Sequence, residues 1–510
     1  MKKKSASFIP IRFILAIVFI LLEFLAMIAI LVVLAKKLPF FYYLCVLTQI
    51  AVVIAIIGSD DNPDFKIPWI VFVVTVPYVG FMAYFVFYSR KLDPKYIKGI
   101  KAAVKESKYI HDDEKLLKEL YNKDSVALSE AKLLLSSSSS HIFNNVKNEY
   151  FSLGDLAFPR MMEDLKSAEK FIWMEYFIIK KGLFWNSILS VLEDKVNNGV
   201  SVKVIYDDIG CMTSLPSAYF KELWKKGIEC VPFSILRGKA DNEFNNRSHR
   251  KILVIDGKIG YTGGINIADE YINEISVYGH WKDCALRLEG EGVKELSRLF
   301  LLDWSMNTRQ DMEVHDYFYP SMDMESRGYV IPFGDAPKPI CQSRVGQELL
   351  TTMFSSSVSY LYITSPYLIL DNNMLQSLEL AAKRGVDVRI IVPFIPDKKI
   401  IRFMGQSYYQ RLLYSGVRIY EYTPGFIHAK TYLSDDKFAM VGTINLDYRS
   451  LVHHFENGVW MYDTDSIQSL KKDFLDTMEK SKEIKYEEIK DTLWYIKALY
   501  AALRFLAPLL

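Results

Sequence analysis

His249-Arg-Lys251-Ile-Leu-Val-Ile-Asp256 is repeated as His428-Ala-Lys430-Thr-Tyr-Leu-Ser-Asp435, and both stretches have the pattern H-x-K-x-x-x-x-D. Each copy is followed by a glycine-containing turn that ends in asparagine, Gly263-Gly-Ile-Asn266 after the first and Gly442-Thr-Ile-Asn445 after the second. Two copies with the same downstream context indicate an internal duplication. The repeat supplies two histidines and two lysines that can surround a single phosphodiester.

The segments before the two motifs repeat the same order of predicted elements: a buried strand, a helix closed by glycine, and a second strand. In the first copy the strands fall at 171–179 and 200–206, with a helical stretch between them that ends at 197–199. In the second copy the elements fall at 360–367, 374–385 and 386–392. The fold class is therefore α/β, with one half over residues 151–330 and another over 331–488. We expect the halves to be α/β/α sandwiches that face each other around a pseudo-twofold axis.

The composition excludes some classes of protein. The sequence has 62 Lys and Arg against 60 Asp and Glu, and its net charge of +2 lacks the basic excess typical of nucleic-acid-binding proteins. Its five cysteines are scattered and form no CxxC pair, which argues against a disulfide framework and a cysteine zinc site. We therefore expect no nucleic-acid partner and a reducing compartment for the main part of the chain.

The first 92 residues differ in kind from the rest. Three apolar runs, at 11–35, 39–58 and 68–88, are each long enough to cross a hydrocarbon core of about 30 Å as a helix. The first run is too long for a cleavable signal peptide and lacks a small-residue cleavage site. We therefore predict transmembrane helices within residues 1–92 and a multi-pass protein of the cell membrane.

The charges beside these runs bear on orientation. The turn at 59–65 is acidic, whereas the segment at 90–101 is basic, and this difference places the remainder of the chain in the cytosol. Three crossings would leave Lys2, Lys3 and Lys4 outside, against the same rule. Whether residues 11–35 span fully is therefore open, and the sequence does not determine the oligomeric state.

Two further segments flank the halves. Residues 93–150 are charged and include a run of serines at 136–140, so we predict a linker. Residues 489–510 place Lys490, Lys497 and Arg504 seven apart among apolar and aromatic residues, which predicts an amphipathic helix. Such a helix either lies in the membrane interface or docks on the protein's own core, and both alternatives remain open.

The motifs have a clear geometry on a strand. Side chains two residues apart share a face, so the histidine and lysine of each motif point into one pocket. The aspartate lies an odd number of positions away, and we expect Asp256 and Asp435 to hold the local backbone rather than to carry protons. The residues that we expect in the pocket are His249, Lys251, His428 and Lys430.

These residue types suit phosphoryl transfer. A neutral imidazole is a good nucleophile toward phosphorus, and a second histidine can protonate the leaving alcohol. The lysines neutralise charge on the non-bridging oxygens, to which Asn266 and Asn445 offer amide donors. The sequence offers no convincing ligand cluster, and we expect no metal and no cofactor. The pattern therefore predicts a two-step exchange through a phosphohistidine, with one histidine from each half.

Each histidine should have an acidic partner on its other ring nitrogen, which fixes the tautomer. Asp283 follows the first motif and Glu456 follows the second at similar distances, so we expect each carboxylate to serve the histidine of its own half. His280 and the pair His453-His454 lie close to these acids, but a polar loop is the simpler interpretation for them.

The paired motifs resemble those of the phospholipase D superfamily, and the wider context resembles the bacterial cardiolipin synthases. The stretches that carry the resemblance are 248–258 with 263–271, 428–431 with 442–450, the hydrophobic segment 67–84 and the ending 508–510. The similarity covers nearly all of residues 40–510. Two features depart from the family: Thr443 stands where serine is frequent, and the run at 11–35 exceeds the usual two spans.

The resemblance implies an enzyme of the bacterial membrane that joins two phosphatidylglycerol molecules into cardiolipin and releases glycerol. It implies that His249 is the nucleophile and His428 the acid and base, although the reverse assignment is open. A phospholipase D or a phosphatidylserine synthase of the same superfamily would use the same residues with a different acceptor. A membrane scaffold with vestigial motifs is a further alternative, against which the two intact motifs argue.

Overall fold

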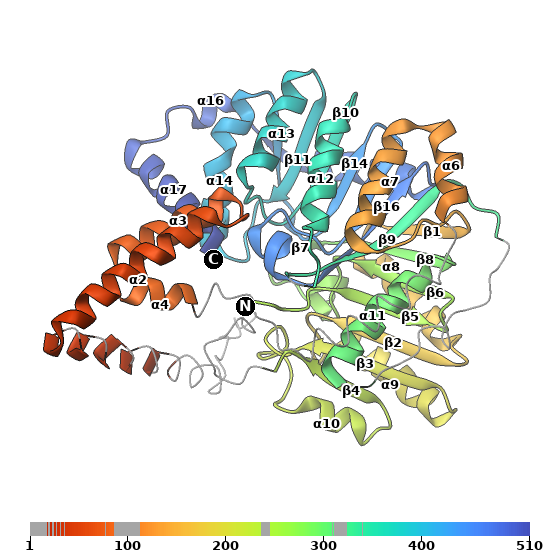
Figure 1. Ribbon diagram of the computed structural model, residues 1–510. Coiled ribbons are helices and arrows are strands. Elements are labelled where there is room, and N and C mark those ends of the chain that lie inside the picture. The colour runs from red at the N-terminus through yellow and green to blue at the C-terminus, as the bar shows by residue number, and fades with distance from the viewer. Residues whose placement is uncertain are drawn as a thin grey trace.

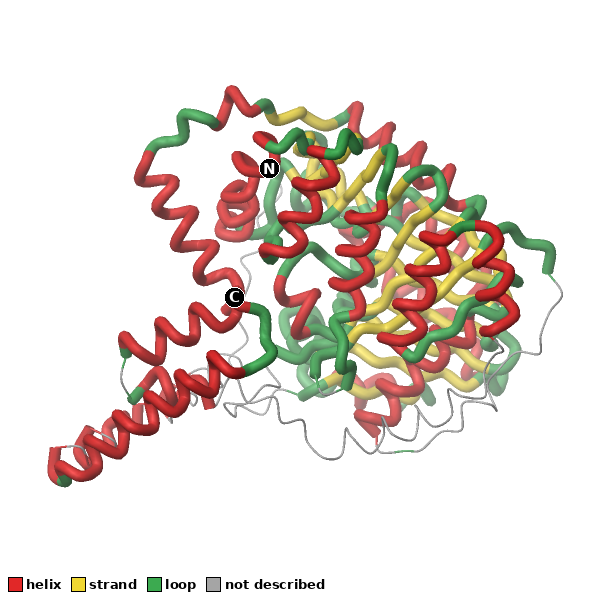
Figure 2. The backbone as a smooth tube through the Cα atoms, turned by 45° about the horizontal axis from the view of Figure 1, so that its top comes forward, coloured by secondary structure: helices red, strands yellow, loops and turns green. Residues whose placement is uncertain are grey.

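The computed structural model describes residues 39–76, 78–85, 113–235, 245–308, 310, 324–338 and 340–509, with single positions between 18 and 38. The predicted span at 11–35 lies largely outside these residues. Figure 1 shows two α/β halves stacked on each other, with the N-terminal helices projecting to one side and the C-terminus beside them. Figure 2 shows the same helices extending away from the strands.

The first half is built on a seven-stranded sheet. Its strands lie in the order β1 (Val146–Phe151), β8 (Ala285–Gly290), β6 (Ile259–Gly263), β5 (Lys251–Ile255), β2 (Phe171–Tyr176), β3 (Ser201–Asp207) and β4 (Glu229–Phe233). Its helices are α8 (Gly154–Lys166), α9 (Leu183–Asn197), α10 (Tyr219–Trp224), η3 (Asp269–Ile272) and α11 (Val293–Thr308). Strand β2 is buried on both faces, because Met174 packs in the core with α8 and α9 while Trp173 stacks on Phe300 of α11.

The second half has an eight-stranded sheet. Its strands lie in the order β17 (Ser481–Ile484), β12 (Arg418–Tyr422), β11 (Asp387–Pro393), β10 (Tyr360–Thr364), β14 (Thr431–Ser434), β15 (Phe438–Gly442), β16 (Glu456–Tyr462) and β9 (Tyr329–Asp335). Its helices are α12 (Val345–Ser356), α13 (Asn372–Lys383), α14 (Lys399–Tyr414), η5 (Arg449–His453) and α15 (Ser466–Glu479). Strand β10 repeats the arrangement of β2, since Ile363 packs with α12 and α13 while Tyr362 stacks on Phe474 of α15.

One hydrophobic core joins the two sheets. It includes Trp173 and Val254 from the first half and Tyr362 and Leu433 from the second, together with residues of α11 and α15. A small parallel sheet of β7 (His280–Lys282) and β13 (Gly425–Ile427) adds a backbone link between the halves. The predicted α/β class with two repeated halves is confirmed, and the shared core fixes how the halves sit on each other.

The motif aspartates hold the backbone at the start of a central strand in each half. Each aspartate lies just after its motif strand, and its backbone has the positive φ that Asp tolerates. Its carboxylate accepts three main-chain N–H groups at 2.7 to 2.9 Å. The donors are Glu169, Lys170 and Phe171 for Asp256, and Val358, Ser359 and Tyr360 for Asp435. These contacts are those that a scaffold role of both aspartates requires.

The predicted linker over residues 93–150 is wrong for its described part. Residues 113–150 form α6 (Asp113–Lys123), α7 (Ser125–Ser138) and most of β1, so the first sheet begins at Val146 rather than 151. Helix α7 packs on β9 and α12, and its serines end the helix instead of loosening the chain: Ser138 Oγ donates to Leu134 O at 2.6 Å. Strand β9 likewise places the start of the second half at Tyr329 rather than 331.

The N-terminal helices α2 to α4, which we call the membrane module, match the predicted transmembrane segments only in part. Helix α2 (Pro39–Gly58) contains a 19-residue stretch, Phe40–Gly58, with mean hydropathy 2.4, the one described helix long and apolar enough to span a bilayer. The predicted span at 68–88 is wrong, because the chain forms α3 (Pro63–Thr75) and a separate α4 (Val79–Ala83). At about 1.5 Å per residue, α3 is shorter than the hydrocarbon core. Its side chains hold the module to the second half through Phe65 and Tyr448, whose ring centroids lie 5.1 Å apart.

The C-terminal segment is helical, as predicted for 489–510, but the long helix starts later. After α16 (Tyr486–Ile489), α17 (Trp494–Leu506) and η6 (Ala507–Leu509) complete the chain. Lys490 therefore lies before α17 and not on its face. Leu503 and Ala507 join the core of the second half, so the helix docks on the protein's own core along one side.

We expect Asp435→Ala to destabilise the second half by about 2 kcal/mol, because three N–H groups at the start of β10 lose a charged acceptor. The measurement is the midpoint of urea unfolding in detergent. Asp476→Ala is the control, since Asp476 pairs with Lys472 on the exposed surface of α15, and its effect should stay within about 0.5 kcal/mol. Equal effects of the two changes would contradict the scaffold role.

Candidate active site

The two motifs meet at the interface between the halves, each held by the backbone of the other half. His249 N donates to Phe455 O at 2.8 Å, and His428 N donates to Lys282 O at 2.7 Å. Because Phe455 immediately precedes Glu456, and Lys282 immediately precedes Asp283, both contacts set a carboxylate of one half beside a histidine of the other. The two sites are therefore related by the pseudo-twofold that relates the halves.

The carboxylate partners are exchanged between the halves. His249 Nδ1 lies 2.9 and 3.0 Å from the two carboxylate oxygens of Glu456, and His428 Nδ1 lies 2.7 Å from Asp283 Oδ2. The acids beside the two histidines are thus Glu456 and Asp283, and each faces the histidine of the other half instead of that of its own half. The physical reason is the backbone pairing across the interface, which is local in space and distant in sequence.

These contacts define the state of the imidazoles. A carboxylate only accepts hydrogen bonds, so Nδ1 carries the hydrogen and Nε2 keeps its lone pair. Burial lowers the pKa of His249 to about 3 and that of His428 to about 4, and both rings are therefore neutral near pH 7. Burial alone would raise the pKa of both carboxyl groups, but attraction to the facing histidine brings the pKa of Glu456 and of Asp283 below its usual range.

The two lysines are buried beside the histidines. Lys251 Nζ donates to His249 O at 2.8 Å, and Lys430 Nζ donates to His428 O and lies 2.9 Å from His428 Nδ1. Burial lowers the pKa of Lys251 to about 7, with the charge of Lys430 lowering it further, and burial lowers the pKa of Lys430 to about 8. Two close, desolvated ammonium groups favour a shared anionic ligand such as a phosphodiester.

The predicted phosphate donors Asn266 and Asn445 differ from each other. Asn266 accepts from Ile178 N at 3.1 Å and donates to Tyr271 Oη at 2.8 Å, so its amide holds the loop after β2. Asn445 is buried, and among the described residues its Oδ1 has no hydrogen-bond partner. Contact with phosphate remains a prediction for Asn445, whereas the structure gives Asn266 a fold-holding role.

The glycine-containing turns support the carboxylates in two ways. A Cβ at Gly264 would lie 1.9 Å from Asp283 Oδ1, so glycine at this position makes room for the acid. Its counterpart Thr443 donates its hydroxyl to Glu456 and also accepts from Asn457 N at 3.0 Å. The sequence pattern marks both turns but does not show that Gly264 and Thr443 lie beside the acids.

Comparisons with known proteins agree with the duplication. The family model described as "Cardiolipin synthase, PLD-like domain" matches residues 161–285 and 350–478, one match in each half, and "Phospholipase_D-nuclease N-terminal" matches 46–87. A cardiolipin synthase of Halalkalibacterium halodurans is 31% identical over 478 residues, which are 92% of this chain and 94% of that protein. One of Geobacillus kaustophilus is 32% identical over 483 residues, 91% of this chain and 92% of that protein.

The chain belongs to the cardiolipin synthase family with phospholipase D-like domains. An uncharacterized protein of Streptococcus mutans is 40% identical over 468 residues, 91% of this chain and 100% of that protein. Among solved structures, a phosphatidylserine synthase of Haemophilus influenzae superposes with a TM-score of 0.57 at 16% identity, covering 75% of this chain and 100% of that one. That likeness shows the fold alone.

His454 lies in the site, although the sequence favours a simple polar loop for it. Its ring centroid lies 5.7 Å from that of His249, and its Nδ1 is 3.6 Å from Glu456 Oε1. Trp281 has the same place beside His428, with ring centroids 5.8 Å apart, and each of these residues lies two positions before the acid. This shared spacing is the feature of the sequence that could have placed His454 and Trp281 beside the histidines. His249, His454 and Glu456 bring donor atoms within 4.8 Å of one another, although His249 and Glu456 are already bonded to each other.

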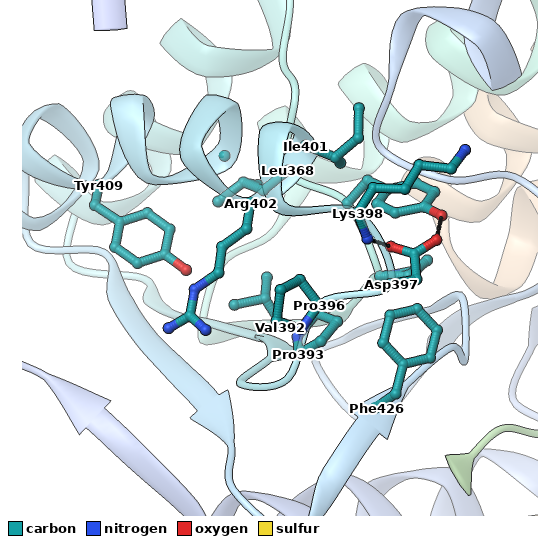
Figure 3. A pocket seen from close by; sticks show the side chains of 13 residues that line it. Leu368, Val392, Pro393, Pro396, Asp397, Lys398, Ile401, Arg402, Tyr409 and Phe426 are labelled. Carbon is teal, nitrogen blue, oxygen red and sulfur yellow. Dashed lines mark hydrogen bonds between the residues drawn. The ribbon is translucent and has the colours of Figure 1, made fainter. Parts of the chain in front are cut away.

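A small cavity of about 30 Å³, with a mixed polar and apolar lining, lies beside the His428 side of the site (Figure 3). Phe426 separates it from His428, with ring centroids 5.8 Å apart. Asp397 accepts from Tyr367 Oη at 2.6 Å and from Lys398 N at 2.7 Å. Figure 3 shows Arg402 on the side of the cavity opposite Asp397.

A double-mutant cycle tests the exchanged pairs. We expect His249→Asn and Glu456→Gln to be coupled by more than about 1 kcal/mol in urea unfolding, because they remove two partners of one buried contact. His249→Asn with Asp283→Asn should be additive within about 0.5 kcal/mol. Additive effects for His249 with Glu456, together with coupling between His249 and Asp283, would support pairing within each half instead.

The lowered lysine pKa values predict proton uptake on anion binding. Above about pH 8 the empty site holds partly neutral lysines, and an anion that needs two ammonium groups must draw protons from solution. Tungstate affinity should therefore fall as the pH rises from 7 to 9. Calorimetry in two buffers of different ionisation enthalpy measures the uptake, which Lys430→Met should reduce. Binding at pH 8.5 without proton uptake would contradict the prediction.

Proposed function

We propose that this protein is a bacterial cardiolipin synthase that transfers a phosphatidyl group from one phosphatidylglycerol molecule to another and releases glycerol. Family membership supports an enzyme that acts on phospholipids. The observation that carries the proposal is the reciprocal pairing of His249 with Glu456 and of His428 with Asp283 at one interface. Two neutral imidazoles, each with its Nδ1 hydrogen held, match a reaction that needs one nucleophile and one proton carrier.

In the first step, His249 Nε2 attacks the phosphorus of phosphatidylglycerol. His428, which is neutral in the empty site, first takes up a proton from solvent at Nε2. The bond from phosphorus to the glycerol oxygen then breaks, and that oxygen takes this proton from His428, which becomes neutral again. The phosphatidyl group is then held on His249 as a phosphohistidine. Lys251 and Lys430 stabilise the negative charge that builds on the non-bridging oxygens, and Asn445 is the candidate for an additional donor.

In the second step, the terminal hydroxyl of another phosphatidylglycerol loses its proton to His428 and attacks the same phosphorus. The bond from phosphorus to His249 breaks, and cardiolipin leaves. Glu456 and Asp283 act as positioning residues that stabilise the positive charge on each imidazole in turn. One phosphodiester is broken and another is formed, so the exchange is nearly balanced in free energy. We propose that no nucleotide, metal or other cofactor takes part.

We infer that the enzyme works at the cell membrane with its two halves in the cytosol. Helix α2 and the match to the N-terminal family model support membrane association. The basic residues that follow the apolar segments support the cytosolic location. A second crossing by residues 11–35 is part of the proposal and would make the protein multi-pass.

The decisive assay supplies the purified protein with phosphatidylglycerol of one defined composition and identifies the lipids by mass spectrometry. We expect cardiolipin and glycerol. Phosphatidic acid as the main product would point to a phospholipase D, and a need for serine would point to a phosphatidylserine synthase. Either outcome would overturn the proposed acceptor and keep the same catalytic residues.

We expect His249→Asn and His428→Asn each to reduce cardiolipin formation by on the order of 10⁴-fold, because each removes one of two groups that act as a unit. His280→Asn is the matched control, since His280 bonds Tyr422 Oη outside the proposed machinery, and it should retain most activity. Rapid quenching with labelled phosphatidylglycerol should place an acid-labile label on the peptide that contains His249. A label on the peptide of His428 would reverse the two roles.

A further inference from the structure

Helix α17 has three faces. At 3.6 residues per turn, the exposed apolar and small residues fall within an arc of about 160°. They are Trp494, Tyr495, Ala498, Leu499, Ala501, Ala502 and Leu506. The docking face carries Leu503, and Ala507 continues it just beyond the helix, while Lys497 and Arg504 form a basic stripe on the remaining side. The core of the second half therefore covers one face and leaves the apolar arc uncovered.

The uncovered arc is unusually apolar for a protein surface. Trp494 is 80% exposed, Tyr495 55%, Leu499 50% and Leu506 41%. Single exposed apolar residues are common on soluble proteins, but a continuous stripe of this kind marks a contact surface. Aromatic residues beside leucine and a basic flank are typical of a helix that lies at the boundary between lipid headgroups and acyl chains.

The position of α17 identifies what covers this arc. The helix packs against α3, and η6 continues that contact, so α17 lies next to the module that contains the candidate spanning helix α2. Figures 1 and 2 both show α17 and the C-terminus beside α3. A crevice of about 340 Å³ runs between α3, α14 and α17, where Ile67, Tyr408 and Phe505 are among its walls. The surface is thus continuous with the part of the protein that associates with the membrane.

The basic stripe indicates which membrane surface suits the helix. Lys497 and Arg504 flank the apolar arc and are both exposed. Cations near the surface of a bilayer that contains anionic lipids gain electrostatic attraction, which a zwitterionic bilayer does not provide. A second copy of the chain on the same arc would leave this flank without a matching acidic partner on α17, which carries no Asp or Glu.

We propose that α17 is an interfacial membrane helix, whose arc from Trp494 to Leu506 lies in an anionic lipid surface while its other face docks on the second half. The helix then forms a second attachment point beside α2 and fixes the tilt of the two halves against the bilayer. The active-site interface would be held at one height above the lipid. This inference requires only membrane association and not the proposed reaction.

A fluorescent probe tests the proposal in the full-length protein, reconstituted into phosphatidylcholine vesicles with and without phosphatidylglycerol. The environment-sensitive label NBD is attached at Leu499→Cys, and lipids spin-labelled in the acyl chains act as quenchers. Leu47→Cys on the exposed side of α2 is the positive control, and Val358→Cys, on a loop where Val358 is 75% exposed, is the negative control. The parent protein treated with the same label sets the background from native cysteines.

We expect a blue-shifted emission at position 499 and quenching comparable with that at position 47, with stronger quenching when phosphatidylglycerol is present. Lys497→Cys on the basic side should be quenched less than Leu499→Cys. Quenching at 499 no greater than at 358 would overturn the proposal. A blue shift that appears without lipid quenching and grows with the protein-to-lipid ratio would assign the arc to a second copy. Cardiolipin formation by the parent protein, measured separately, keeps failure of this inference distinct from failure of the proposed function.

Discussion

The exchange of carboxylates between the halves is the contact on which the site depends. Glu456 reaches His249 and Asp283 reaches His428 only because the backbone segments beside them pair across the interface. A buried carboxylate without its partner is costly, so the docking of the halves and the ordering of the histidines are energetically linked. Arg250 strengthens this link, since its buried guanidinium bonds Asp303 of its own half at 2.6 Å and also reaches Glu456 O at 3.1 Å.

Much of the molecule could be predicted from the duplication. The order of strand, helix, glycine and strand predicted two α/β halves. The odd spacing within each motif predicted that Asp256 and Asp435 point away from the pocket, and their carboxylates bond backbone N–H groups instead. The identity of the two acids was also predictable from their similar distance to the motifs. Their partners were not, because sequence distance suggests pairing within a half, whereas β-strand contacts across an interface join residues that are far apart in sequence.

Composition does not predict the secondary structure of two segments in which a local interaction decides it. The serines at 136–140 are typical of a linker, but at the end of α7 the hydroxyls of Ser136 and Ser138 bond helix carbonyls, and Ser139 takes a left-handed conformation that closes the helix. The apolar run at 68–88 has the length of a span, but α3 ends at Thr75 and Tyr78 has a φ of 67°. Hydropathy measures the preference for lipid and carries no information about such a break.

The two half-sites are similar but not equivalent, and their differences follow from the acids. Asp283 is the shorter side chain, and Gly264 lets the backbone approach it closely; Glu456 is longer, and Thr443 in the matching position donates to it. Around the imidazoles, Trp281 and Tyr271 pack on His428, whereas His454 and Phe177 pack on His249. The two repeated halves therefore give each histidine its own environment, and this difference suits the proposed reaction, in which one histidine is the nucleophile and the other the proton carrier.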